Sequence, residues 1–197
     1  MSAMSNVTVP ADGQEGMVDM TSTATRTTPV PTEAEDRTTP LENAENGFVA
    51  SERLREHLQR VMVDLVDLQL TGKQAHWNIV GPNFRDLHLN LDEVVDIARQ
   101  GTDVFAERMR ALHATPDGRA GVVAGNSSLP LFPAGEIATH DAIDVIVQAI
   151  GATVGTMRAV HDEVDEEDPT TADLLHEYIA SLEQQAWFLS AEVRTPR

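Results

Sequence analysis

Apolar residues recur at spacings of three and four along four long segments of this 197-residue chain, and this periodicity limits the fold more than any other feature. In residues 51–78 the apolar stripe runs from Leu54 to Gly72, and Ser51 is a suitable N-cap. The other helical segments span residues 83–113, 139–165 and 170–193. No stretch shows the alternation of a half-buried strand, so the chain is expected to be all-α.

The connections between these segments favour one helical architecture. Gly81-Pro82 ends the first helix, and Asn83 can cap the second. Residues 114–136 contain several glycines and prolines and predict a long connection with a short helix inside it. Asp168-Pro169-Thr170 separates the last two helices, where Thr170 and Asp173 resemble a capping box. Two short connections and one long central one predict a ferritin-like four-helix bundle with a crossover.

Composition changes sharply at the beginning of the first helical segment. Residues 1–46 are rich in Ser, Thr and Pro, carry eight acidic and two basic residues (net −6), and show no apolar periodicity. Such a segment cannot bury enough surface to offset its ordering entropy, so we expect a disordered tail, a solvated spacer or alternatively a docking arm. Residues 47–197 then form the bundle domain.

Charge and cysteine content exclude several classes of function. The chain has no cysteine, which excludes disulfides, thiolate metal sites and a cysteine nucleophile. A net charge of −18 argues against nonspecific binding to nucleic acid or to an anionic membrane. No signal-peptide pattern is present, and the apolar window at residues 143–154 is shorter than the roughly 20 residues of a membrane span. We expect a cytoplasmic location, with nucleoid association as the alternative.

The second helical segment carries a polar stripe beside its apolar face. At 100° per residue, one arc of this helix holds six polar side chains: His88, Asp92, Asp96, Arg99, Asp103 and Glu107. His88/Asp92 and Asp103/Glu107 are i, i+4 pairs, which lie close enough to share a metal ion. Imidazole and carboxylate ligands suit Fe, Mn or Zn. A solvated helix face explains the stripe equally well.

Helix length limits how these two pairs could cooperate. Asp92 and Asp103 are separated by about 16 Å of helix, so the pairs cannot hold one metal centre within a single chain. They form either two half-sites or a site completed by a second subunit across a two-fold axis. The Glu-x-x-His motif of an intrachain di-iron bundle is absent from the sequence, which favours the shared site.

The other histidines carry weaker signals. His76 continues the apolar stripe of the first helix and is expected to face inward, where a lone histidine is more often a hydrogen-bonded core residue than a ligand. The five remaining histidines show no ligand spacing and are interpreted as surface or packing residues: His57, His113, His140, His161 and His176.

One stretch carries a specific resemblance. The sequence KQAHWNIVGPNF at residues 73–84, followed by Leu87-His88, Asp92 and residues 103–108, resembles the signature of the Dps family, the DNA-binding proteins from starved cells. These are miniferritins of the ferritin-like superfamily, and the resemblance covers about residues 51–194. It implies a di-iron ferroxidase centre shared between two subunits, in which Zn or Mn can substitute. Its implied ligands are His76, His88 and Asp92 of one subunit and Asp103 and Glu107 of the other.

The resemblance also implies an assembly and an activity. The expected protein is a hollow homo-dodecameric shell that oxidises Fe(II), preferably with hydrogen peroxide, stores ferric mineral and protects DNA. The alternatives are a nucleoid-compacting DNA-binding protein and a shell holding structural Zn or Mn. Direct DNA binding is doubtful because the tail is acidic and lacks lysine. Trp77 and Trp187 match tryptophans near the family's site, and we expect core packing to be their main role.

An acidic run precedes the last helix. Residues 163–168 hold five carboxylates, and Asp173 lies nearby in the next helix. A solvated acidic loop is the simple interpretation. In the Dps family this turn lies near a three-fold axis, so the resemblance implies that Asp168 and Asp173 line a pore for iron uptake, with Asp165 as a weaker candidate.

Overall fold

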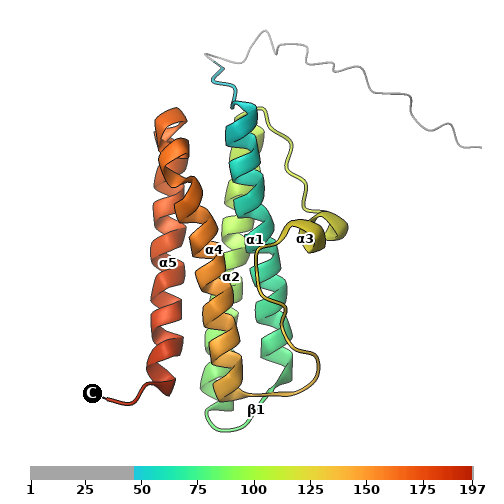
Figure 1. Ribbon diagram of the computed structural model, residues 1–197, viewed down its shortest axis with the longest axis vertical. Coiled ribbons are helices and arrows are strands. Elements are labelled where there is room, and N and C mark those ends of the chain that lie inside the picture. Colours follow the sequence, from blue (N-terminus) through green and yellow to red (C-terminus); the bar gives the residue numbers. More distant parts are fainter. Residues whose placement is uncertain (1–46, 197) are drawn as a thin grey trace, which may run out of the picture. The chain divides into compact units, whose positions relative to one another are not determined.

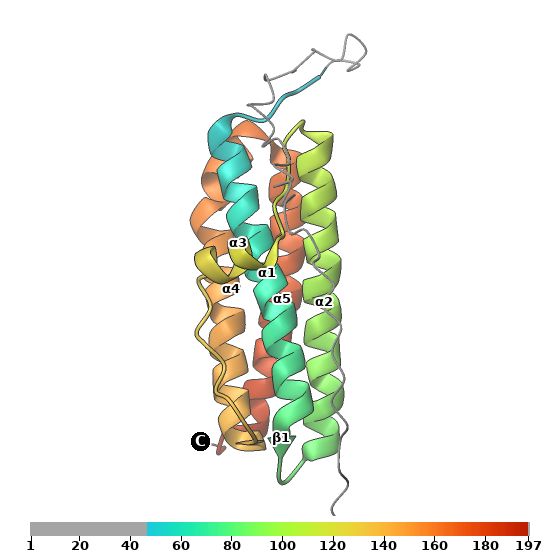
Figure 2. The same ribbon diagram turned by 90° about the vertical axis from the view of Figure 1, so that its right-hand side faces the viewer.

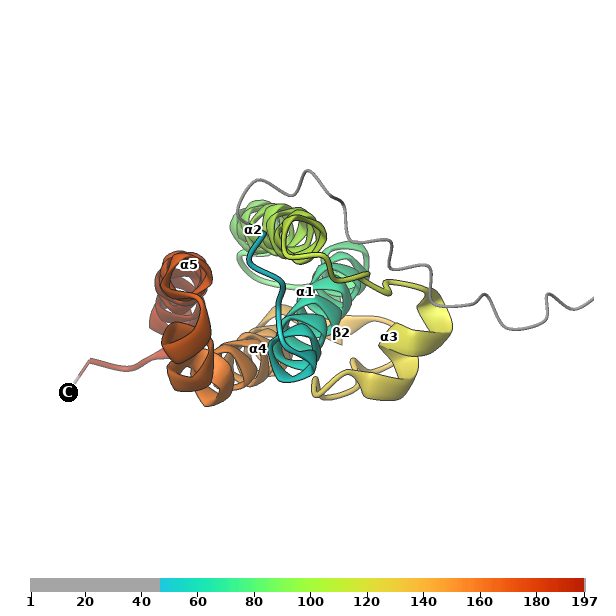
Figure 3. The same ribbon diagram turned by 90° about the horizontal axis from the view of Figure 1, so that it is seen from above.

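The computed structural model describes residues 47–196, so the predicted disordered tail (residues 1–46) lies outside the described part. Four long helices lie side by side, as Figure 1 shows: α1 (Glu52–Asn78), α2 (Phe84–Ala111), α4 (Thr139–Glu167) and α5 (Pro169–Val193). The short helix α3 (Ala120–Asn126) lies outside the bundle next to α1 (Figure 3). The expected all-α bundle with a long crossover is confirmed.

The apolar stripes predicted from the sequence form the core. Leu54 to Leu68 on α1, Ile143 to Val164 on α4 and Leu175 to Leu189 on α5 supply side chains with little or no exposure. Gly72 allows α1 and α2 to approach closely, because a Cβ at this position would lie 2.7 Å from Cγ2 of Val95. Burial of these faces is the main favourable contribution to folding.

Of two helix-end predictions, one is confirmed and one is wrong. Ser51 caps α1 as expected, accepting a hydrogen bond from the Leu54 amide at 3.1 Å. The predicted capping box at Thr170 is wrong: α4 continues to Glu167, and Asp168 alone separates it from α5. Pro169 occupies the first position of α5, where its missing N–H costs no hydrogen bond, so Thr170 already lies inside the helix.

Helix α4 is long and apolar, with a mean hydropathy of 1.3 over its most apolar 18-residue window. Half of that window is buried against the other helices of the bundle. Its length and composition would also suit a membrane span, but a core-facing apolar stripe gives the same pattern in a bundle helix.

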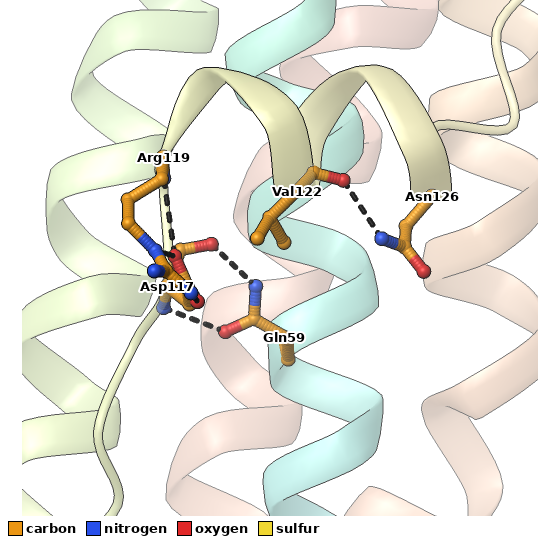
Figure 4. A network of polar contacts seen from close by, with 5 residues as sticks. All are labelled: Gln59, Asp117, Arg119, Val122 and Asn126. Atoms are coloured by element: carbon orange, nitrogen blue, oxygen red, sulfur yellow. Dashed lines mark hydrogen bonds and ion pairs between the residues drawn. The ribbon is translucent and has the colours of Figure 1, made fainter. Parts of the chain in front are cut away.

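The crossover between α2 and α4 has to return along the bundle, because these two helices run in the same direction (Figures 1 and 2). Gln59 of α1 holds its first part: its Nε2 donates to the carbonyl oxygen of Asp117 at 2.8 Å, and its Oε1 accepts from the Asp117 amide at 2.9 Å. Figure 4 shows this clamp together with Arg119, whose guanidinium binds the Asp117 carboxylate. The clamp places α3 against α1.

A buried carboxylate holds the next part of the crossover. Asp64 of α1 is 2% exposed and accepts hydrogen bonds from the amide of Ser128 (2.8 Å), the hydroxyl of Ser128 (2.6 Å) and the hydroxyl of Thr156 (2.6 Å). A buried charge requires such hydrogen bonds, because its desolvation is otherwise uncompensated. Asp64 therefore connects α1, the crossover and α4.

A two-stranded parallel sheet closes the end of the crossover, and sequence analysis did not predict it. Ile79 and Val80 (β1) pair with Ile137 and Ala138 (β2). Two residues are too few to show strand alternation. The hydroxyl of Thr139 also donates to the carbonyl oxygen of Pro82 at 2.8 Å. The α1–α2 turn is thereby fixed to the start of α4.

We predict that Asp64→Ala lowers the free energy of unfolding by about 3 kcal/mol, because the three hydrogen bonds that its buried carboxylate accepts are lost. Asp67→Ala is the matched control, since half-buried Asp67 accepts one bond, from the Ser127 hydroxyl at 2.5 Å. Urea denaturation of both variants provides the measurement. Equal effects of the two substitutions would contradict the role given to Asp64.

Candidate metal centre

The turn between α1 and α2 brings two histidines together. His76 lies near the end of α1, and His88 lies in the second turn of α2. The chain reverses between them through Gly81 (φ 122°) and Asn83 (φ 59°), both in the left-handed region that Gly and Asn tolerate best. The two imidazoles stack with their centroids 3.6 Å apart and their planes at 24°. We call them the first histidine pair.

Reciprocal hydrogen bonds orient the first histidine pair. Nδ1 of His76 lies 3.0 Å from the carbonyl oxygen of His88, and Nδ1 of His88 lies 3.1 Å from the carbonyl oxygen of His76. Since a carbonyl oxygen only accepts, the network assigns the proton of each neutral ring to Nδ1. Both Nε2 atoms then keep a lone pair, which is the state a metal ligand needs.

Asp92 completes a group of three possible ligands. One ligand atom each from His76, His88 and Asp92 lies within 4.8 Å of the other two. The His76 side chain is 11% exposed, in agreement with its expected inward orientation, whereas that of Asp92 is 41% exposed. In the described part of the chain, this is the single cluster of three or more histidine and carboxylate side chains that is this compact.

Lys73 binds the carboxylate of this group. Its Nζ lies 2.5 Å from Oδ1 of Asp92. This hydrogen bond is the main reason why the pKa of the Asp92 carboxyl is lowered, and the nearby His76 and His88 act in the same direction. Sequence reasoning missed Lys73, although it is the only lysine of the chain and lies three residues before His76 on the same helix.

The chain does not bring Asp103 and Glu107 to this group. Both are exposed on α2, 11 and 15 residues after Asp92, which corresponds to about 16 and 22 Å of helix. Asp103 borders a shallow hollow that also includes Gln69 and Arg99. Their role as ligands therefore remains a prediction that requires a second subunit.

Three aromatic side chains depart from expectation. Trp77 is 70% exposed and Trp187 is 61% exposed, so core packing within the chain is not their main role. Phe84 is apolar but 44% exposed, because it begins α2, and its ring stacks on His88 with the centroids 5.2 Å apart. Exposed aromatic groups of this size are typical of surfaces that contact a partner.

The two residues predicted to line a pore differ in their surroundings. The Asp168 side chain is 10% exposed and accepts a hydrogen bond from Nη2 of Arg108 at 2.6 Å and another from the Thr171 hydroxyl. Asp173 is 87% exposed, and its nearest basic group is Nδ1 of His176 at 4.0 Å. Within one chain, Arg108 compensates the charge of Asp168, whereas the charge of Asp173 stays open to solvent.

Comparison with known proteins places this geometry in a family. The family model "Ferritin-like domain" matches residues 55–197. The DNA protection during starvation protein of Agrobacterium fabrum is 33% identical over 70% of this chain and 85% of that protein. The fine tangled pili major subunit of Haemophilus ducreyi is 34% identical over 80% of this chain and 82% of that protein. The structure of Dps from Microbacterium arborescens in the high iron form is 34% identical, covers 74% of this chain and 98% of that chain, and superposes with a TM-score of 0.69.

We predict that Lys73→Met raises the pKa of the Asp92 carboxyl in the metal-free protein, because the hydrogen bond and the positive charge that favour the carboxylate are lost. Carboxyl ¹³C NMR titration measures this directly. Arg99→Met is the matched control: Arg99 binds Asp96 at 2.9 Å on the same helix, so its loss leaves Asp92 unaffected. An unchanged Asp92 titration in Lys73→Met would refute the assignment.

Proposed function

The chain belongs to the Dps family of ferritin-like proteins, and from this premise we propose that it oxidises Fe(II) at sites shared between subunits and stores the ferric product. Iron storage and DNA protection are the general functions of that family. The observation that carries the proposal is the first histidine pair with Asp92, in which both Nε2 atoms and a carboxylate are available to a metal ion.

The second half of each site comes from another subunit in this proposal. Asp103 and Glu107 lie too far along α2 to reach His88 in the same chain, so a two-fold partner has to supply them. Two antiparallel copies of α2 across a two-fold axis would form two identical sites. Exposed Trp77 and Trp187 supply apolar surface for such contacts, and twelve subunits would enclose the storage cavity.

Fe(II) is the substrate of this reaction, with hydrogen peroxide as the preferred oxidant. Two Fe(II) ions, one hydrogen peroxide and two protons give two Fe(III) ions and two water molecules, so both electrons can pass in one event without release of a hydroxyl radical. Carboxylates from Asp92, Asp103 and Glu107 stabilise Fe(III) over Fe(II), with Glu107 proposed to bridge the two ions. Zn or Mn can occupy the same ligands.

In this proposal the protein protects DNA by removing Fe(II) and peroxide and not by binding to the DNA. A net charge of −18 removes the counterion-release contribution that supports binding to phosphates. We therefore favour removal of Fe(II) and peroxide as the protective activity, with direct nucleoid compaction as the alternative function.

Ligand variants should show that the site is shared. His88→Ala/Asp92→Ala and Asp103→Ala/Glu107→Ala are each expected to slow Fe(II) oxidation about tenfold or more, because each removes two of the five proposed ligands. Co-assembly of the two double variants should restore part of the activity, since some interfaces then contain one intact site. Absorbance of ferric product after addition of peroxide measures both effects.

Asp96→Ala is the matched control for these variants, because Asp96 lies on the same polar stripe and pairs with Arg99. It should oxidise Fe(II) at the wild-type rate. Mixed assemblies without any recovery would contradict the shared site, and wild-type rates in both double variants would contradict the ligand assignment itself.

The pore proposal gives a test that depends on salt. Three copies of exposed Asp173 around a three-fold axis would attract Fe(II), so Asp173→Asn should slow iron uptake roughly threefold or more at low ionic strength. The defect should shrink as salt rises, because screening weakens the wild-type field. Asp168→Asn is less informative, since it also breaks the pair with Arg108. Wild-type uptake by Asp173→Asn at low salt would exclude Asp173 from the pathway.

A further inference from the structure

A second pair of histidines faces one another between α4 and α5, far from the first. The rings of His161 and His176 have their centroids 4.4 Å apart and their planes at 33°. Both lie toward the α4–α5 turn, at the opposite end of the bundle from β1 (Figures 1 and 2). Since His161 is 22 residues into α4, the two pairs are roughly 25 Å apart along the bundle.

One ring nitrogen of His161 has no hydrogen-bond partner in the described part of the chain. Its Nδ1 lies 3.0 Å from Oδ1 of Asp162, and because a carboxylate accepts, the proton is assigned to Nδ1. Its Nε2 is shielded from solvent and has no hydrogen-bond partner within residues 47–196. Among the buried side-chain nitrogen and oxygen atoms of these residues, it alone lacks a partner. Buried polar atoms nearly always have a hydrogen-bond partner or a ligand. The unpaired Nε2 of His161 is therefore an exception that a bound ligand would explain.

His176 and Asp173 supply further donor atoms from α5. The His176 side chain is 62% exposed, so a ring rotation meets little packing resistance. Asp173 lies one turn earlier on the same helix face, with its Oδ1 4.0 Å from Nδ1 of His176. A modest change of rotamer brings this exposed carboxylate toward the two imidazoles.

The space beside the two rings is open to solvent, and its one basic side chain is paired. A surface hollow there is lined by both histidines and by Arg158, Ile179, Ala180 and Glu183. Arg158 would repel a cation if it were free, but its Nη2 lies 2.6 Å from Oε1 of Glu183. The carboxylate of Asp162, fully exposed next to His161, makes the surroundings negative.

We propose that His161 and His176 bind one divalent transition-metal ion between α4 and α5, with Asp173 and solvent completing the coordination. Borderline ions such as Zn²⁺ prefer imidazole nitrogen, and a metal provides the buried Nε2 of His161 with its missing partner. Asp162 acts as a positioning residue, because its bond to Nδ1 fixes the ring orientation and the tautomer of His161. The site shares no residue with the first histidine pair or its carboxylates.

Zn²⁺ titration of the full-length protein tests this proposal in a His76→Ala/His88→Ala background, which removes the imidazole ligands of the other site. Isothermal titration calorimetry should show about one Zn²⁺ per chain. His161→Ala and His176→Ala should each weaken this binding about tenfold or more, and Asp162→Asn about tenfold. Exposed His176 can be replaced without loss of core packing, so its variant remains informative even if the His161 variant folds poorly.

His140→Ala is the matched control. His140 lies on the same helix α4, is exposed, and places its Nδ1 3.4 Å from the carboxylate of the next residue, Asp141, but it has no second histidine stacked on it. It should leave Zn²⁺ binding unchanged. Equal affinity and stoichiometry in His176→Ala and the parent would overturn the proposal, as would loss of binding in His140→Ala to the same extent as in His176→Ala.

Discussion

The long crossover is the constraint on which the rest of this structure depends. Because α2 and α4 run in the same direction, residues 112–138 must return along a helix of about 42 Å. Such a connection costs conformational entropy unless it is held to the bundle. Gln59, the buried carboxylate of Asp64 and the β1–β2 pair hold it at three successive points. These attachments offset part of that cost and so favour burial of the four apolar stripes in this order.

The same attachments shape the candidate metal centre. Strand β1 is also the first part of the α1–α2 turn, so its pairing with β2 and the bond from Thr139 to the Pro82 carbonyl fix that turn at both ends. His76 and His88 then meet with each Nδ1 against the backbone carbonyl of the other. Backbone atoms therefore set the tautomer and the orientation of both rings.

Local sequence patterns were sufficient to predict those features that depend on a single helix. The cap at Ser51, the buried stripes and the inward orientation of His76 depend on 3.6-residue periodicity and are confirmed. Contacts between elements were not predictable in this way. The β1–β2 pair is too short to show a pattern, and Arg108 reaches Asp168 across 60 residues of chain. For Asp103 and Glu107, helix length shows only that one chain is insufficient, and their pairing with another subunit is our proposal.

The two histidine pairs use different hydrogen-bond acceptors to hold the proton of a ring on Nδ1. Each needs an acceptor at Nδ1 so that Nε2 keeps its lone pair. In the first pair the acceptors are carbonyl oxygens, which carry no net charge, and Lys73 balances the charge of Asp92. At His161 the acceptor is the carboxylate of Asp162, which supplies negative charge to the site directly. The first arrangement depends on a turn locked by the crossover, whereas the second depends only on the packing of α4 against α5, so damage to the crossover should disturb the first pair and spare the second.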